Sequence, residues 1–465
     1  MFELLAWLTG IVIVWAAIHV YERERDPLHP LMFLGPLFAY SYSVSPLVLF
    51  YGGRLNRLFP EPEQLEYVQL VCLVAIALFV VGCARARVRG RLPPGVEAYP
   101  DLVAIDPHMA RRMMHFGVLM GCLGMLAYLI MIYNVGGFAY AYSTPKGGGY
   151  SPSGYIGEGP LLVYPAIILV AMSARQKRLE WWHIVLALLF ASPQLVHGIL
   201  GGRRGPLFLV LATLFLSFFI ARGVRPTRNM ILGGVLGIGF AVMLVWSQRQ
   251  QIFVGSEMQF EKESVLEKLL PKEEDLVGNT YVYGAGAILN ARYHGAYGWG
   301  RKYLVNLFVR PIPRQIWPTK YEDTIPVVPR ETENAWRRSL GWIPLAGSAS
   351  GFISDAYGEF GLGCLVAACL MGLFCGYCWK KSVIEGGVWQ IIFMEVLILS
   401  IYLPTQSFSA FWYRLLFMGV PTWLVWRYYI VGFRRPAMDE WPPLGVMETE
   451  LDRRQQQAPQ SPKSS

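Results

Sequence analysis

The chain has 465 residues, of which 54% are hydrophobic and only 16% charged, and it carries a formal net charge of +9. Soluble domains usually contain about 25% charged residues, so this composition excludes an ordinary soluble protein and indicates a membrane protein. The positive charge does not indicate a nucleic-acid-binding protein, because the basic residues mostly flank apolar runs.

Apolar runs long enough to cross a bilayer recur along the chain. A helix needs roughly 20 mainly apolar residues to span the hydrocarbon core and to satisfy its own backbone groups there. We therefore predict an all-α polytopic membrane protein with about eleven transmembrane helices. The first run has neither a basic start nor an A-x-A cleavage site, so we interpret it as a retained span. The runs lie near residues 2–20, 31–51, 66–84, 113–133, 158–174, 181–199, 205–222, 230–248, 361–378, 387–404 and 411–431.

The distribution of arginine and lysine over the short loops predicts the orientation. Loops on one side of the predicted membrane are rich in basic residues, for example at Arg85, Arg175 and Arg222. By the positive-inside rule this side is cytoplasmic, so the N-terminus is predicted to be non-cytoplasmic and the C-terminus cytoplasmic. The short loops on the other side carry fewer basic residues: Arg54, Arg57, Lys146, Arg203 and Arg204.

The predicted spans divide the chain into four parts. Residues 1–248 hold eight helices, 249–358 form a large non-cytoplasmic loop, 359–432 hold three more helices, and 433–465 form a cytoplasmic tail that we expect to be disordered. All seven cysteines fall within apolar runs, so no disulfide framework is implied. We interpret the C-x-x-C of Cys375 and Cys378 as helix packing.

The large loop is predicted to be ordered and partly helical. Residues 257–275 are acidic and predict a short amphipathic surface helix that ends at Pro271. Residues 277–289 are apolar but too short for a confident span, which suggests a surface or re-entrant helix. Residues 292–338 are net basic and rich in tyrosine and tryptophan, a composition that is unusual for a disordered linker.

The basic, aromatic segment predicts a phosphate-binding surface. Arg310 and Arg314 bracket a Pro-Ile-Pro turn, and Lys320 follows shortly after it. Guanidinium groups bind phosphate oxygens through two parallel hydrogen bonds. Aromatic side chains such as Trp317 suit sugar faces or lipid headgroups. The alternative interpretation is a basic anchor that contacts lipid phosphates at the membrane surface.

A second basic pair, Arg203 and Arg204, lies between the sixth and seventh predicted spans in the stretch GGRRGPLF. Charged side chains at a membrane edge are costly, which makes a functional role plausible. One interpretation is a clamp for a pyrophosphate group. The other is that both arginines extend to the lipid headgroups while their aliphatic stems lie against apolar surface.

Several acidic residues and one histidine are candidates for proton transfer or charge pairing. Asp355 and Glu359 are four residues apart, so they share one face at the outer end of the ninth span. Either one is a general base for a hydroxyl acceptor, or both stabilise the helix dipole. His294 in the large loop is a further candidate base. Within the membrane we predict that Glu395 forms a structural pair with Arg414.

Three stretches occur in the order GGRRGPLF, VRPIPRQIWPTKYED and SGFISDAYGEFGLG. They resemble motifs of the O-antigen polymerase (oligosaccharide repeat-unit polymerase) family of bacterial envelopes, and the number and arrangement of spans extend the resemblance over nearly the whole chain. The resemblance implies a GT-C-like helical fold. It also implies a metal-independent membrane glycosyltransferase, without a cofactor, that uses undecaprenyl-diphosphate-linked oligosaccharides as donor and acceptor.

The same resemblance implies roles for individual residues. The spacing of Arg330 and Gly341 matches an R-x10-G pattern of some members, and the outer loops contain no D-x-D. The chain departs from the family pattern at two positions: Asp355 stands in place of a glutamate, and Glu359 in place of an asparagine. The resemblance therefore does not decide which residue is the general base. The implied diphosphate-binding residues are Arg203, Arg204, Arg310, Arg314, Lys320 and Arg330, the sugar-binding residues Trp317 and Tyr357, and the candidate catalytic residues Asp355, Glu359 and His294.

We therefore expect an enzyme that polymerises lipid-linked repeat units into a cell-surface polysaccharide (O-antigen, capsule or exopolysaccharide) at the periplasmic face of the bacterial inner membrane. The expected partners are the lipid-linked oligosaccharide, membrane lipids, and flippase and chain-length regulator proteins, with no nucleic acid. Two alternatives stay open at this point. One is a glycan transferase of the O-antigen ligase type, and the other is a non-enzymatic polysaccharide transporter.

Overall fold

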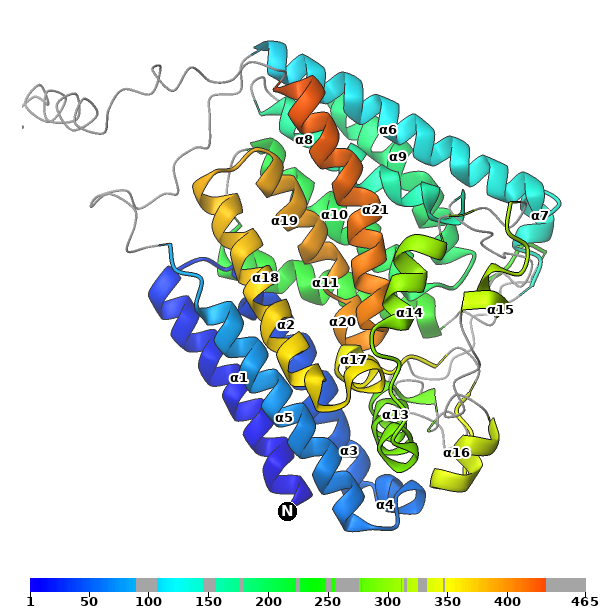
Figure 1. The fold of residues 1–465 in the computed structure, drawn as a ribbon. Coiled ribbons are helices and arrows are strands. Elements are labelled where there is room, and N and C mark those ends of the chain that lie inside the picture. Colours follow the sequence, from blue (N-terminus) through cyan, green and yellow to red (C-terminus); the bar gives the residue numbers. More distant parts are fainter. Residues whose placement is uncertain are drawn as a thin grey trace, which may run out of the picture.

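The structure is a computed structural model, and the regular elements in its described residues are all helices (Figure 1). In an apolar segment without access to water, a helix provides hydrogen-bond partners for the backbone N–H and C=O groups within the segment itself. The structure describes residues 1–88, 107–144, 156–175, 179–222, 226–247, 252–255, 276, 278–310, 312, 316–324, 333–345 and 348–431.

Ten helices in the described residues are long and apolar enough to cross a membrane, so the chain is a multi-pass membrane protein. They correspond in order to the first ten predicted spans. They are α1 (Phe2–Glu24), α2 with α3 (Pro30–Ala39 and Ser45–Tyr51), α5 (Pro62–Ala84), α6 (Pro107–Asn134), η3 with α8 (Ile156–Leu162 and Val163–Ala174), α9 (Trp181–Ile199), α10 (Arg204–Arg222), α11 (Arg228–Ser247), α17 with α18 (Phe352–Phe360 and Cys364–Ile384) and α19 with α20 (Val388–Leu399 and Tyr402–Thr405).

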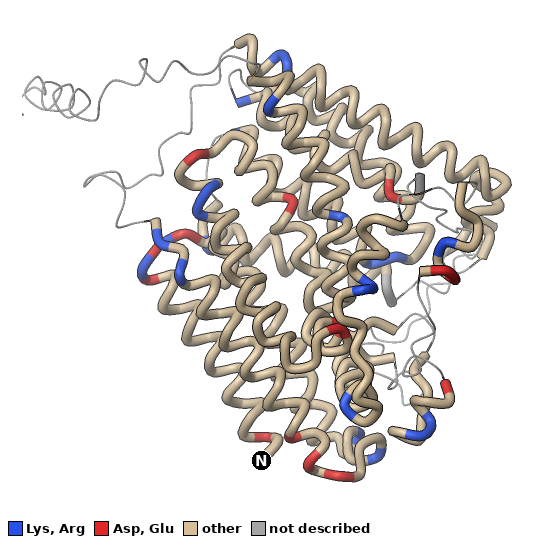
Figure 2. The backbone as a smooth tube through the Cα atoms, in the orientation of Figure 1, with Lys and Arg blue, Asp and Glu red and all other residues tan. Residues whose placement is uncertain are grey.

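The eleventh predicted span is a helix, α21 (Phe408–Val425), but it is not among the ten. Its sequence includes Arg414, Pro421, one tyrosine and two tryptophans, which lower its mean hydropathy. Along the long helices charged residues are sparse, and they gather at helix ends and in the connecting segments (Figure 2). Arg414 is therefore an unusual residue for its position.

Helices α5 and α18 approach each other closely. Gly372 and Gly376 stand four residues apart on one face of α18, a small-xxx-small spacing that lets helix backbones approach closely. A Cβ atom at Gly372 would collide with the carbonyl oxygen of Phe79, and one at Gly376 would lie 2.8 Å from the carbonyl oxygen of Cys83. Only glycine fits at these two positions.

Replacing Gly372 by leucine is expected to destabilise the protein by about 3 kcal/mol or more, because the side chain must push two packed backbones apart. The matched control is Gly233→Leu on α11, where a Cβ atom meets nothing within 4 Å. The thermal midpoints of the two purified variants in detergent measure the difference. A midpoint for Gly372→Leu equal to that of Gly233→Leu would contradict this packing.

The large loop forms short helices that gather at one end of the bundle, which we call the loop end (Figure 1). They are α13 (Thr280–His294), α14 (Arg301–Leu304), η5 (Val305–Val309), α15 (Lys320–Thr324) and α16 (Glu333–Leu340). Residues 277–289 fall largely within α13, as a helix, but α13 is buried against α17, α5 and α16 and is not a surface helix. Helix α17 begins inside the predicted loop and continues through η7 (Gly361–Gly363) into α18.

Two predicted segments lie outside the described residues. They are the amphipathic helix within residues 257–275 and the tail at 433–465. The described part of the loop covers the starts of α17 and α21, and this contact brings polar side chains from distant parts of the chain together.

Candidate functional site

Two arginines from different parts of the chain converge on one glutamate at the loop end. Arg310 follows η5, Arg414 lies in the second turn of α21, and Glu158 lies in η3. The Arg310 Nη2 atom lies 2.5 Å from Glu158 Oε1, and the Arg414 Nε atom lies 4.0 Å from Glu158 Oε2. Because 26% of the Arg310 side chain is exposed, the group is open enough to meet a ligand.

Two tyrosines cover the flat faces of these guanidinium groups. Arg310 lies over the ring of Tyr413 at 4.2 Å, and Arg414 lies over the rings of Tyr402 and Tyr413 at 4.4 and 4.7 Å from the ring centroids. Such stacking holds an arginine in place while its N–H edges stay available for hydrogen bonds. We call Arg310, Arg414, Glu158, Tyr402 and Tyr413 the arginine cluster.

The predicted pair Arg203 and Arg204 lies at the start of α10, with both side chains exposed. This turn is next to the arginine cluster, because a Cβ atom at Gly205 would lie 3.1 Å from the hydroxyl oxygen of Tyr402. Tyr402 therefore contacts both the GGRRG turn, at Gly205, and the guanidinium group of Arg414. Two further predicted phosphate ligands, Arg314 and Arg330, lie outside the described residues.

Lys320 is buried, and its ammonium group holds the backbone beside Arg310. Its Nζ atom donates to the carbonyl oxygens of Val309, Arg310 and Ile312, at 3.2, 2.9 and 2.5 Å. These carbonyls lie at and just beyond the end of η5, where a helix end leaves acceptors unsatisfied. All three donors of Lys320 are thus used within the chain. In this arrangement Lys320 holds the backbone beside Arg310, and its predicted contact with a diphosphate stays a prediction.

Trp317 is also tied to its own segment. Its indole Nε1 donates to Asp323 Oδ2 at 2.6 Å, and the Thr319 hydroxyl donates to the same oxygen at 2.7 Å. These two hydrogen bonds stabilise the charged carboxylate and lower the pKa of Asp323. The indole ring is partly exposed, so Trp317 keeps a surface for a ligand at the start of α15.

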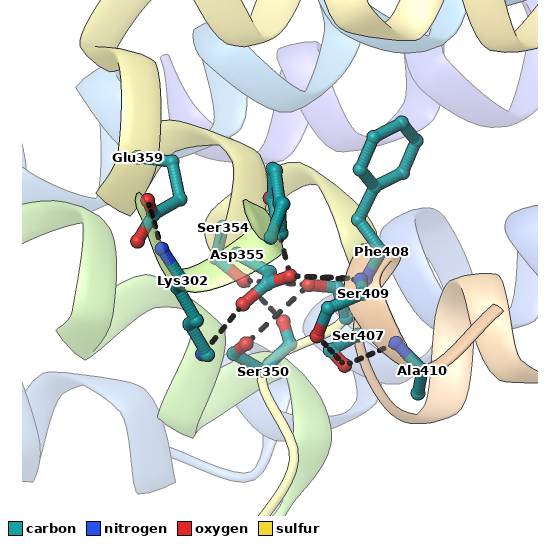
Figure 3. Close-up of polar contacts among 11 residues, drawn as sticks. Lys302, Ser350, Ser354, Asp355, Glu359, Ser407, Phe408, Ser409 and Ala410 are labelled. Carbon is teal, nitrogen blue, oxygen red and sulfur yellow. Dashed lines mark hydrogen bonds and ion pairs between the residues drawn. The ribbon is translucent and has the colours of Figure 1, made fainter. Parts of the chain in front are cut away.

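Asp355 joins three segments at a second polar site (Figure 3). Its Oδ1 atom accepts from Lys302 Nζ at 2.9 Å, and its Oδ2 atom accepts from the Tyr303 hydroxyl at 3.2 Å. The same Oδ2 atom accepts from the backbone N–H groups of Phe408 and Ser409, at 3.1 and 3.3 Å. Asp355 therefore connects α14, α17 and the N-terminus of α21, where the helix dipole favours a negative charge.

Tyr303 is a hydroxyl donor in this arrangement. Burial, followed by the charges of Asp355 and Glu359, raises the pKa of Tyr303 far above its ordinary value. The neutral hydroxyl is thus maintained at any physiological pH. Its ring packs against Phe408, 5.5 Å between centroids, which adds an apolar contact to the same junction.

Glu359 supports the same junction from the end of α17. Its Oε2 atom accepts from the backbone N–H of Lys302 at 3.4 Å, and its side chain packs directly on Gly298. The carbonyl oxygen of Glu359 accepts from the N–H of Trp299 at 2.7 Å. The two carboxylates predicted as candidate bases therefore hold α14 against α17 and α21. These contacts are structural, but they differ from the alternative that the sequence left open, because Glu359 lies in the last turn of α17 and not at its N-terminus. We call this group the carboxylate junction.

His294 and Tyr357 lie apart from the arginine cluster. The Nε2 atom of His294 lies 3.5 Å from the carbonyl oxygen of Ala335 on α16. The Tyr357 side chain is almost fully buried, and its hydroxyl is hydrogen-bonded to that of Tyr67 at 2.7 Å. A buried ring cannot offer its face to a sugar. Nearby, Trp299 is 74% exposed and offers such a face.

The predicted pair of Glu395 and Arg414 is wrong. Glu395 is fully buried and accepts a hydrogen bond from the Thr422 hydroxyl at 3.2 Å, whereas Arg414 faces Glu158. Gln406 and the carbonyl oxygen of Ala410 accept from Arg414 Nη1 as well, at 3.4 and 3.1 Å. Arg414 thus belongs to the loop end of α21, and Glu395 belongs to the packing of α19 against α21.

The sequence analysis missed Glu158, Lys302 and Tyr402 as site residues. Arg414 gave the clearest signal, because it interrupts an otherwise apolar run. Comparison of the chain with protein-family models, with curated proteins and with solved structures finds no match. The candidate function therefore rests on the geometry of the two polar sites and on the sequence motifs that lie in them.

Proposed function

We propose that this protein is a membrane glycosyltransferase that joins diphosphate-linked oligosaccharide repeat units into a cell-surface polysaccharide. The observation that carries the proposal is the convergence of Arg310 from the large loop, Arg414 from the last long helix and the Arg203–Arg204 turn at the loop end. Arginines fixed by stacking suit a diphosphate, because charge-assisted hydrogen bonds to its oxygens are strong and directional.

In the proposed reaction a sugar hydroxyl of the acceptor attacks the anomeric carbon of the donor. The new glycosidic C–O bond forms as the bond between that carbon and the lipid diphosphate breaks, and the proton of the hydroxyl passes to an oxygen of the departing diphosphate. The leaving group gains negative charge in the transition state, and pre-positioned guanidinium groups stabilise that charge. This arrangement requires no metal ion, and the chain's own arginines supply the electrostatic stabilisation.

The carboxylate junction contributes indirectly to this reaction. Asp355 accepts hydrogen bonds from four donors, so we assign it a positioning role at the start of α21. Arg414 lies six residues beyond Phe408, about 9 Å further along the helix axis. The exposed ring of Trp299, held by the backbone of Glu359, is the proposed surface for a sugar face.

The setting of the reaction belongs to the same proposal. A GT-C-like arrangement of helices, a bacterial inner membrane and a periplasmic loop end would allow the enzyme to meet lipid-linked repeat units after a flippase has moved them across the bilayer. The cytoplasmic enrichment of arginine and lysine supports this orientation. A chain-length regulator is the other partner that we propose.

Deleting the gene in its host tests the proposed function. The expected result is loss of the ladder of polysaccharide lengths and accumulation of single repeat units on the lipid carrier, both visible on gels of extracted glycan. Restoring the wild-type gene should restore the ladder. Long chains retained on the lipid carrier after deletion would indicate a ligase instead, and an unchanged ladder would exclude both activities.

A further inference from the structure

Glu158 occupies the position in the arginine cluster at which an anionic ligand would bind. It places one carboxylate oxygen towards each arginine, with 2.5 Å to Arg310 and 4.0 Å to Arg414. Tyr413 stacks on Arg310, and Tyr402 and Tyr413 stack on Arg414, so the N–H edges of the guanidinium groups are the side on which an anion binds. Glu158 lies on those edges.

We propose that Arg310 and Arg414 form a binding site for a phosphate or diphosphate group and that Glu158 fills this site until the ligand displaces it. The inference rests on the proposed function and adds an internal competitor to it. Glu158 thereby sets the selectivity of the site, since a ligand must carry more charge and more acceptor oxygens than one carboxylate in order to replace it.

The unequal distances support displacement. The contact to Arg310 is close, whereas the 4.0 Å separation to Arg414 is too long for a hydrogen bond. A carboxylate has two oxygens and reaches only one arginine well, but a diphosphate has enough oxygens to bind both. The ligand can therefore form a hydrogen bond with Arg414, whereas Glu158 forms only the longer ion pair.

The position of Glu158 allows it to leave. It is the third residue of η3, at the start of the span that continues as α8, and its side chain is 11% exposed. Rotation about its own side-chain torsions can carry the carboxylate away from the cluster without breaking a helix. With Glu158 in place the three charged groups sum to +1, and without it to +2, so removing the carboxylate strengthens the attraction for an anion.

Binding of diphosphates to the purified full-length protein in detergent tests this inference. The probes are inorganic diphosphate and farnesyl diphosphate, a short lipid diphosphate, titrated by calorimetry. We expect Glu158→Gln to bind at least about tenfold more tightly than wild type. The control Glu63→Gln removes an exposed acid at the start of α5 and should leave the affinity unchanged. Loss of packing alone would not tighten binding.

The arginine variants separate the two levels of the proposal. If Arg310→Gln and Arg414→Gln weaken binding but Glu158→Gln does not tighten it, the displacement inference is wrong and the proposed diphosphate site stands. If both arginine variants bind as wild type does, the site itself is wrong.

Should Glu158→Gln fail to fold, Glu158→Asp withdraws the carboxylate by one methylene, and tighter binding is again the supporting result. Tightening for inorganic diphosphate alone assigns the site to free phosphates, and tightening for both probes assigns it to a lipid diphosphate.

Discussion

Replacing Arg414 by alanine is expected to lower the rate of polymer formation by about 10²-fold or more, the effect typical of removing one group that stabilises a developing negative charge. The variant leaves Glu158 paired with Arg310 alone, removes the cation from the ring of Tyr402, and leaves the ring of Tyr413 with Arg310 only. The readout is the length distribution of the glycan in cells, at equal amounts of protein in the membrane.

The matched control for Arg414 is Arg427→Ala in η8 (Trp426–Ile430), the short helix that follows α21. Its side chain is exposed, so this change removes the same charge without touching the arginine cluster. Arg414→Lys keeps the charge but not the planar fork, and it should restore only part of the activity. A full ladder with Arg414→Ala would mean that the arginine cluster does not bind the reacting diphosphate.

The second large effect is expected for Asp355→Ala, which should reduce stability and activity together. The change leaves the N-terminal N–H groups of α21 and the hydroxyl of Tyr303 without their acceptor. The expected loss is about 3 kcal/mol, at the lower end of the range for a broken buried pair, because the partner Lys302 is 44% exposed and remains solvated. The thermal midpoint in detergent and the polymer yield measure the two effects.

A catalytic role for Asp355 makes a different prediction from a positioning role. If Asp355 were the general base, Asp355→Asn would abolish activity and leave the thermal midpoint near that of wild type. We expect the midpoint to fall, since an amide nitrogen cannot accept from the donors that surround the carboxylate. The control Asp323→Asn changes an exposed carboxylate in the same loop and should leave stability close to that of wild type.

Most of the membrane-spanning architecture could be predicted from the sequence, because a run of apolar residues is a local signal. The first ten predicted runs correspond to ten helices that can cross a membrane. The segment at residues 277–289, predicted as a surface or re-entrant helix, lies largely in a helix that is buried and not at the surface. Its glycine and alanine residues permit close packing against α16 and α17, and that burial depends on partners distant in the sequence.

The candidate site was less predictable because its contacts are long-range. Glu158 and Arg310 are separated by 152 positions, and Asp355 and Phe408 by 53. No local pattern relates such residues. The Pro-Ile-Pro context selected Arg310, which lies in the arginine cluster. The same reasoning assigned Lys320 to the ligand, whereas in the structure its three donors bind the backbone carbonyls beside Arg310. Residue type alone does not distinguish a buried structural lysine from a phosphate ligand.

The central claim is that the loop-end arginines bind the diphosphate of a lipid-linked sugar during polymerisation. The most direct measurement incubates purified wild-type and Arg414→Ala protein with lipid-linked repeat units in detergent, without any ion gradient, and resolves the products by length. We predict a ladder of polymers with wild type and single units with Arg414→Ala. If folded wild-type protein yields only single units, or if both proteins yield equal ladders, the claim is contradicted.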